Sequence, residues 1–168
     1  MTPGVRWWPV LIVLAACTAL PAVETVTLGD GTVVELEPAA EVEREEAAGR
    51  IALRSGDGLV VTLQELAVDE RGVESRTVAV VAAAIAERVK LRERNGELVQ
   101  SSCEVGGRPA ECLDGWQERD GTRFARSGAV VQLGTRIVWL DVAGPQTRGA
   151  AVIERSRTVR ASLRVRGS

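Results

Sequence analysis

The chain has 168 residues, with 21 basic and 23 acidic side chains and no histidine. This length fits one ordinary domain with a core of its own. A formal net charge of −2 gives no global attraction for nucleic acid. The absence of histidine excludes serine–histidine and cysteine–histidine nucleophiles as well as histidine zinc sites.

The first sixteen residues are typical of a secretory signal peptide. Arg6 precedes a short apolar run from Trp7 to Ala16, which ends in small residues. A transmembrane helix needs about 20 apolar residues, and this run is about half as long. Pro9 lies inside it, where a helix interior resists proline. We therefore predict that the chain is exported, with residues 1–16 as the leader.

The segment Leu14-Ala15-Ala16-Cys17 resembles the lipobox of bacterial lipoproteins. In that family the signal peptidase cuts before the cysteine, which then carries the lipids. The resemblance implies lipidation of Cys17. We further predict a short tether up to residue 23 and a single α+β domain over residues 24–168. The chain would face the periplasm or lie at the outer membrane of a bacterial cell envelope. Ordinary signal cleavage is the alternative, because Cys17-Thr18-Ala19 offers a small-x-small site.

Strand signals with Asp-Gly turns open the predicted domain. Asp-Gly between apolar or β-branched runs is a strong hairpin signal. Two such hairpins are predicted, from residues 25–28 and 32–36 around Gly29-Asp30-Gly31, and from residues 50–54 and 59–66 around 55–58. The acidic, alanine-rich stretch 38–48 between them is predicted to be a loop or one short helix.

The clearest helical pattern starts at Ser75. The apolar residues that recur at the spacing of one helix face are Val78, Val81, Ile85 and Val89. We predict one long central helix that ends at Asn95-Gly96, with Gly96 in the left-handed conformation of a C-cap.

Cys103 and Cys112 remain once Cys17 is assigned to the anchor. A four-residue loop at 106–109 would set them directly opposite each other in a hairpin. Directly opposed residues in a non-hydrogen-bonded pair lie about 4.5 Å apart at Cα, within disulfide range. An exported chain permits disulfides, so we predict a structural bridge. The alternative is a redox pair, which usually uses Cys-x-x-Cys at a helix start.

The chain ends in a further hairpin and a basic helix. Gly134-Thr135 is predicted to turn residues 129–133 back onto 136–142, with Val130 opposite Trp139 and Val131 opposite Val138. A final helix, capped by Thr147, is expected to bury Val152, Val159 and Leu163. Its arginines, which suit the negative end of a helix dipole, are Arg155, Arg157, Arg160, Arg164 and Arg166.

This order of elements predicts an α+β fold with antiparallel hairpins, a central helix and a C-terminal helix. Val105–Ala110, the meander that ends at Val142–Pro145 and the closing helix that runs into Ala161–Val165 together resemble the PsbP-like α/β sandwich. The resemblance covers most of residues 24–166. It implies a small binding or assembly module, and it carries over no catalytic residues.

The acidic residues form no catalytic or metal pattern. Glu41, Glu43 and Glu45 alternate but lack the glycine and the spacing of a calcium loop. The aspartates that precede a turn glycine, and need no glycosidase role, are Asp30, Asp57, Asp114 and Asp120. We expect no enzyme activity, no metal and no cofactor.

The sequence therefore predicts a membrane-anchored envelope lipoprotein that binds an envelope protein partner without catalysis. The alternative is a structural lipoprotein whose basic C-terminal helix contacts anionic lipid or cell-wall polymer. The residues of that contact would be Arg155, Arg157, Arg160, Arg164 and Arg166.

Overall fold

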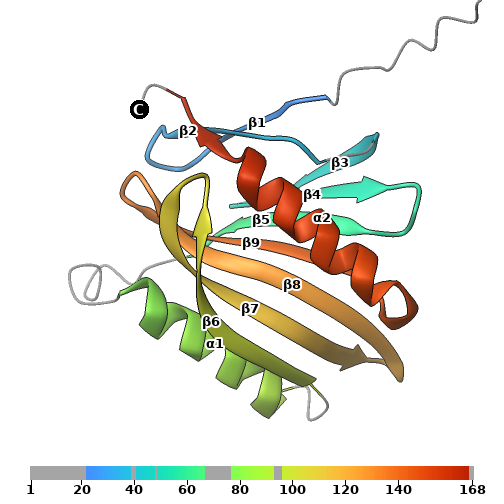
Figure 1. Cartoon of the computed structure of the whole chain (residues 1–168). Coiled ribbons are helices and arrows are strands. Elements are labelled where there is room, and N and C mark those ends of the chain that lie inside the picture. The colour runs from blue at the N-terminus through green and yellow to red at the C-terminus, as the bar shows by residue number, and fades with distance from the viewer. Residues whose placement is uncertain (1–21, 39–40, 48, 67–76, 93–95, 167–168) are drawn as a thin grey trace, which may run out of the picture.

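The computed structural model describes residues 22–38, 41–47, 49–66, 77–92 and 96–166. These residues form two antiparallel sheets and two α-helices (Figure 1). The small sheet has the strand order β1-β2-β10, and the large sheet has the order β3-β4-β5-β9-β8-β7-β6. The strands are β1 (Glu24–Thr27), β2 (Val33–Leu36), β3 (Val42–Ala47), β4 (Arg50–Ser55), β5 (Val60–Glu65), β6 (Gly96–Val105), β7 (Arg108–Arg119), β8 (Thr122–Leu133), β9 (Arg136–Pro145) and β10 (Arg164–Val165). The helices are α1 (Val78–Arg92), the 3₁₀ turn η1 (Gln146–Arg148) and α2 (Gly149–Ser162).

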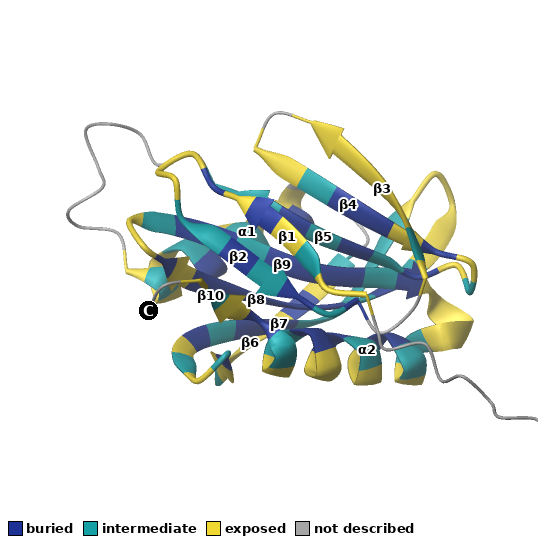
Figure 2. Ribbon diagram, turned by 90° about the horizontal axis from the view of Figure 1, so that it is seen from above, coloured by how far each residue is buried: buried dark blue, intermediate teal, exposed yellow. Residues whose placement is uncertain are grey.

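One face of the large sheet is covered by the small sheet and α2. Val34 of β2 and Val152 of α2 pack in the same apolar cluster as Val131 and Leu140 of the large sheet. All four side chains are at most 1% exposed. The view in Figure 2 shows the small sheet lying over the large one. Burial of this apolar surface provides the main stabilising free energy of the fold.

Helix α1 covers part of the opposite face. Its Ala82 and Val89 pack against Leu113 of β7 and Val130 of β8. Val130 and Val131 are neighbours in sequence and belong to different clusters, because successive side chains of a strand point to opposite faces. The predicted helix exists, but it lies over β6, β7 and β8 at one end of the sheet and is not central. Among the described residues, strands β4, β5 and β9 have no comparable helix packing on this face.

Several predicted elements are confirmed. The two early hairpins form as β1–β2 and β4–β5. The last hairpin has the predicted register, with Val130 opposite Trp139 and Val131 opposite Val138. Helix α2 buries Val152 and Val159, and its C-cap residue Leu163 is buried as well.

Residues 38–48 were expected to form a loop or a helix, and that prediction is wrong. Residues 42–47 form the edge strand β3, which pairs with β4. Five of its six residues are exposed, so no apolar alternation marks it in the sequence. Its hydrogen bonds to β4 are what define it.

Two predicted helix caps are also wrong. Gly96 is the first residue of β6, and a Cβ there would lie 2.7 Å from Cγ1 of Val89. This glycine therefore serves close packing of α1 against the sheet. Thr147 lies within η1, and Arg148 occupies the N-cap of α2 with no side-chain cap bond. The preceding 3₁₀ turn moves the N-cap one residue further along.

Candidate binding site on the open face of the sheet

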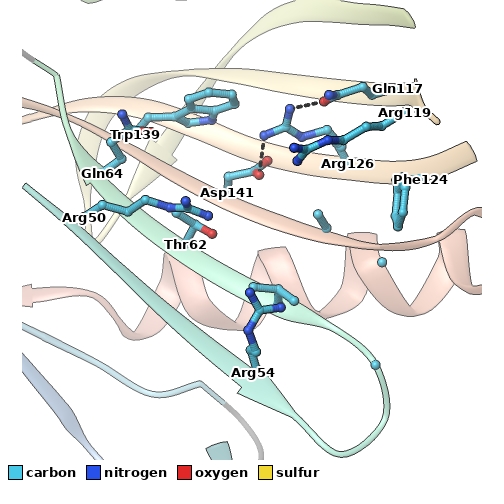
Figure 3. Close-up of a pocket in the computed structure, with 14 residues that line it drawn as sticks. Arg50, Arg54, Thr62, Gln64, Gln117, Arg119, Phe124, Arg126, Trp139 and Asp141 are labelled. Carbon is cyan, nitrogen blue, oxygen red and sulfur yellow. Dashed lines mark hydrogen bonds and ion pairs between the residues drawn. The ribbon is translucent and has the colours of Figure 1, made fainter. Parts of the chain in front are cut away.

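The uncovered part of the large sheet is hollowed into a pocket of about 310 Å³ (Figure 3). Side chains of β4, β5, β7, β8 and β9 line it. Its charged and aromatic residues are Arg50, Arg54, Arg119, Phe124, Arg126, Trp139 and Asp141. These residues come from four strands, so the antiparallel register assembles the site.

The register explains why a hollow forms here. Asp141 of β9 lies opposite Thr62 on one side and Gly128 on the other. Gly128 adds no side chain to this face, and a Cβ there would lie 3.0 Å from Nε1 of Trp139. The glycine thus leaves the space that the indole of Trp139 and the carboxylate of Asp141 border.

A buried ion pair forms the charged wall of the pocket. Nη2 of Arg126 donates to Oδ2 of Asp141 at 2.6 Å, and the two side chains are 16% and 8% exposed. Nη1 of Arg126 donates to Gln117, and its guanidinium lies 4.7 Å from the ring centroid of Trp139. Burial raises the pKa of Asp141, while the positive charges of Arg126 and Arg50 oppose the rise. Asp141 therefore depends on its arginine neighbours to stay ionised.

The pocket has more positive charge and more hydrogen-bond donors than it uses. Four arginines line it against one carboxylate. Among the described residues, neither Nε of Arg126 nor Nε1 of Trp139 has a hydrogen-bond partner, although both atoms are buried. Both groups can donate and neither can accept. These two donors therefore lack an acceptor.

The pocket lining contains one carboxylate. Its single carboxylate is engaged by Arg126, so it offers no second carboxylate for paired acid–base chemistry. In the part of the chain that the structure describes, no group of three or more Cys, Asp and Glu residues is placed to hold a metal ion. No helix among the described residues is long and apolar enough to span a bilayer.

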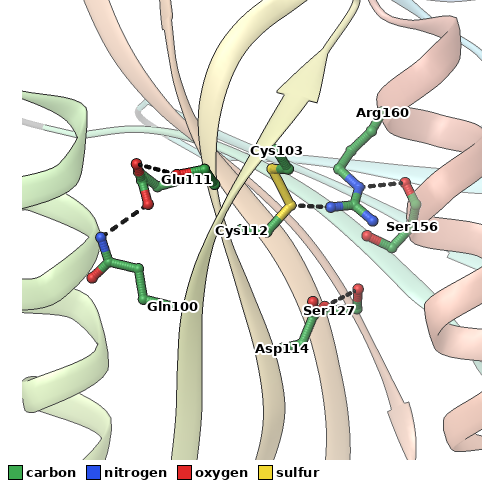
Figure 4. Close-up of a disulfide and its surroundings, with 9 residues drawn as sticks. Gln100, Cys103, Glu111, Cys112, Asp114, Ser127, Ser156 and Arg160 are labelled. Atoms are coloured by element: carbon green, nitrogen blue, oxygen red, sulfur yellow. Dashed lines mark hydrogen bonds between the residues drawn. A yellow bond between two sulfur atoms is a disulfide. The ribbon is translucent and has the colours of Figure 1, made fainter.

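The cysteine pair lies in the β6–β7 hairpin, on the face that α2 covers (Figure 4). The sulfur atoms are 2.13 Å apart and the Cα atoms 5.8 Å apart, which is disulfide geometry. The predicted four-residue loop is wrong, because Gly106-Gly107 alone makes the turn, with φ of +57° and +76°. Cys103 consequently lies opposite Ala110. A register shift of two residues keeps both cysteines on one face, so a diagonal bridge replaces the predicted direct one.

We predict that mass spectrometry of non-reduced peptides will find Cys103 joined to Cys112. The two cysteines are nine positions apart. For a loop of this size the chain-entropy model gives about 2–3 kcal/mol. The double variant C103S/C112S should lose that much free energy of unfolding in a urea titration. Two free thiols in protein from an oxidising compartment would contradict the bridge.

The five arginines of the C-terminal region divide between two settings. Arg157, Arg160 and Arg164 line one surface hollow, while Arg155 and Arg166 are held in ion pairs. Arg155 pairs with Asp57 at 2.9 Å, and Arg166 pairs with Glu35 at 3.3 Å. Arg160 is half-buried, donates to Ser156 O and Cys112 Sγ, and has its pKa lowered by burial. Arg164 donates to the backbone carbonyls of Ala161 and Leu163. Arg157 is exposed on α2.

The remaining sequence-predicted site residue, Cys17, lies outside the described residues. The sequence analysis did not select Arg126, Trp139 or Asp141. One signal was available: Asp141 is a charged residue inside the apolar strand segment 137–142. A charge in that position is unusual for a buried strand.

The comparisons with known proteins establish the fold. No family model matches the sequence, and no curated protein is significantly similar to it. CyanoP, the cyanobacterial PsbP of Synechocystis, aligns at a TM-score of 0.58 with 15% identity over 90% of this chain and 98% of its own. A protein of unknown function from Pseudomonas aeruginosa aligns at 0.58 with 13% identity over 87% and 99%. LpqN, involved in cell envelope biogenesis of Mycobacterium tuberculosis, reaches 0.45 with 11% identity over 86% and 90%. The chain has a PsbP-like fold with mixed helices and antiparallel sheets.

Proposed function

We propose that this chain is a non-catalytic binding module of the bacterial cell envelope, and that the open-face pocket is its binding site. The observation that carries the proposal is a concave site with buried, unpartnered donors among the described residues. Concave sites with a few convergent polar groups are where proteins bind ligands. Envelope attachment would come from lipids on Cys17, with residues 17–23 as the tether to the domain.

The pocket is favoured over the basic C-terminal helix as the contact site. Arg155 and Arg166 are held in ion pairs with carboxylates of the same chain, and Arg160 is half-buried. An anionic surface would have to compete with those partners. If the helix nevertheless binds anionic lipid, co-sedimentation with anionic vesicles should be lost in Arg157→Gln and retained in Arg119→Gln.

Site-specific photocrosslinking in the native envelope tests the proposal. A photoreactive residue at Arg119, an exposed residue of the pocket rim, should give a defined adduct with a bound molecule. The same residue at Arg157, on the helix that covers the other face, is the matched control and should not give that adduct. Equal adducts at both positions, or none at Arg119, would contradict a binding site in the pocket.

The anchor is tested by replacing Cys17 with Ser. The leader should then remain uncleaved, or the protein should leave the membrane fraction, because the lipid attachment atom is gone. Membrane fractionation and mass spectrometry of the mature N-terminus measure this. A wild-type chain that starts at Ala19 or Val23 without lipid would show ordinary signal cleavage.

A further inference from the structure

The ligand of the open-face pocket can be inferred from the donors that the pocket leaves unused. Nε1 of Trp139 and Nε of Arg126 are buried and unpartnered among the described residues. A buried donor without an acceptor carries an uncompensated desolvation penalty. The guanidinium of Arg126 lies over the Trp139 ring, so the two donors belong to neighbouring groups. Both atoms are closed to solvent, so a turn of the Trp139 or Arg126 side chain would bring them onto acceptor atoms of a bound molecule.

The charge of the lining residues indicates that the acceptor belongs to an anion. Four arginines face one carboxylate in the pocket, and that carboxylate already binds Nη2 of Arg126. Water or a carbonyl group would satisfy the two donors but would leave this positive excess unbalanced. Arginine forms its strongest hydrogen bonds with phosphate and carboxylate oxygens. Arg54 also pairs with Glu45 at 3.2 Å, and Arg119 lies 3.9 Å from Asp120. Both arginines are more than half exposed, and exposed ion pairs contribute little, so a phosphate group with up to two negative charges can compete for them.

Size and lining exclude a large ligand inside the pocket. A volume of about 310 Å³ is at the lower end of the range for small-molecule sites. Val60, Phe124 and Ala143 add apolar surface beside the arginines. A phosphate group with a short organic substituent fits both properties.

We infer that the pocket binds a phosphate ester, with phosphate oxygens accepting from Nε1 of Trp139 and Nε of Arg126 and with Arg50 and Arg119 adding positive charge at the rim. This inference rests on the proposed function of the same pocket. The phosphate could belong to a soluble ester or to a phospholipid headgroup, since both present the same oxygens.

Calorimetric titration of the full mature protein in detergent tests the inference. Glycerol 3-phosphate should bind and glycerol should not. The double variant R50Q/R119Q should weaken binding by about tenfold, and the control R157Q, with a loss of charge on α2, should leave it unchanged.

Trp139→Phe keeps the ring and removes the donor, so it should also weaken binding. Asp141→Asn removes the competing negative charge and should tighten it. Arg50 and Arg119 are exposed, and thermal melts of these variants will verify that the fold is retained.

The outcomes distinguish a soluble phosphate ester from a phospholipid headgroup, and they also show whether the inference is wrong. Binding of glycerol 3-phosphate supports a soluble ester. Binding that appears only with phosphatidylglycerol nanodiscs, and depends on Arg50 and Arg119, supports a headgroup. Equal weakening by R157Q would show unspecific charge attraction and overturn the inference. If no phosphate compound binds but the crosslink at Arg119 still forms, the phosphate inference is wrong and the proposed function stands. If the crosslink is absent as well, both the inference and the proposed function are wrong.

Discussion

Replacing Arg126 with Ala should destabilise the protein by about 3–5 kcal/mol, the usual effect of removing one partner of a buried ion pair. Asp141 would stay in a site where it is 8% exposed, without the guanidinium that binds it at 2.6 Å. Gln117 would lose its partner as well. Urea unfolding at neutral pH measures the loss.

The same variant should regain stability in acid. Burial already raises the pKa of Asp141 in the wild-type protein, and loss of Arg126 removes the main opposing charge. The penalty for burying the carboxylate is fully present above that raised pKa. This penalty disappears as the pH falls through the raised pKa toward the ordinary value of 3.8, because the neutral acid is buried more easily.

A double replacement provides the control. R126M/D141L removes both charges and keeps similar volumes, so its stability at neutral pH should be close to wild type. If Arg126→Ala were as stable as the double variant, or showed no gain on acidification, Asp141 would not depend on Arg126.

The second large effect is expected at the tip of the β6–β7 hairpin, where it meets the end of α2. Gly106 has φ of +57°, and a Cβ there would lie 2.2 Å from the carbonyl oxygen of Leu163. Its N–H also donates to the carbonyl of Arg160 at 2.9 Å. Gly106→Ala should therefore combine the left-handed backbone penalty of about 1–2 kcal/mol with a steric penalty of about 1–3 kcal/mol.

Gly107 is the matched control for this prediction. It occupies the same turn with φ of +76°, but nothing lies within 4 Å of its Cβ position. Gly107→Ala should show the backbone penalty of about 1–2 kcal/mol alone. Thermal or urea unfolding of both variants separates the two contributions. Equal losses would mean that the hairpin tip does not pack against the end of α2.

The elements that could be predicted are those whose signals are local. The Gly134-Thr135 turn and its alternating neighbours fixed the pairing of Val130 with Trp139. The spacing of Val152 and Val159 likewise identified the buried side of α2. Turn chemistry and helical periodicity act over a few residues, so they can be read without the rest of the chain.

The site depends on contacts that sequence patterns do not show. Arg126 and Asp141 are fifteen positions apart and meet because β8 and β9 pair in one particular register. The pocket also requires that α1 cover only β6 to β8, which follows from where the helix docks. The Gly106-Gly107 turn could be predicted only in part. Its glycines marked a turn, but the length of the loop was predicted wrongly because Arg108 and Pro109 also suit a turn.

The acidic strand β3 has a consequence for how copies of this chain meet. It ends the large sheet, so its outer backbone groups could pair with a strand of another molecule. Its exposed side chains are mostly charged, with Arg44 paired to Glu46 and Glu45 paired to Arg54. A partner strand would have to fit its own side chains among these charged groups, which disfavours edge-to-edge association. The charged sequence that hid β3 from sequence analysis thus also protects the open edge of the sheet.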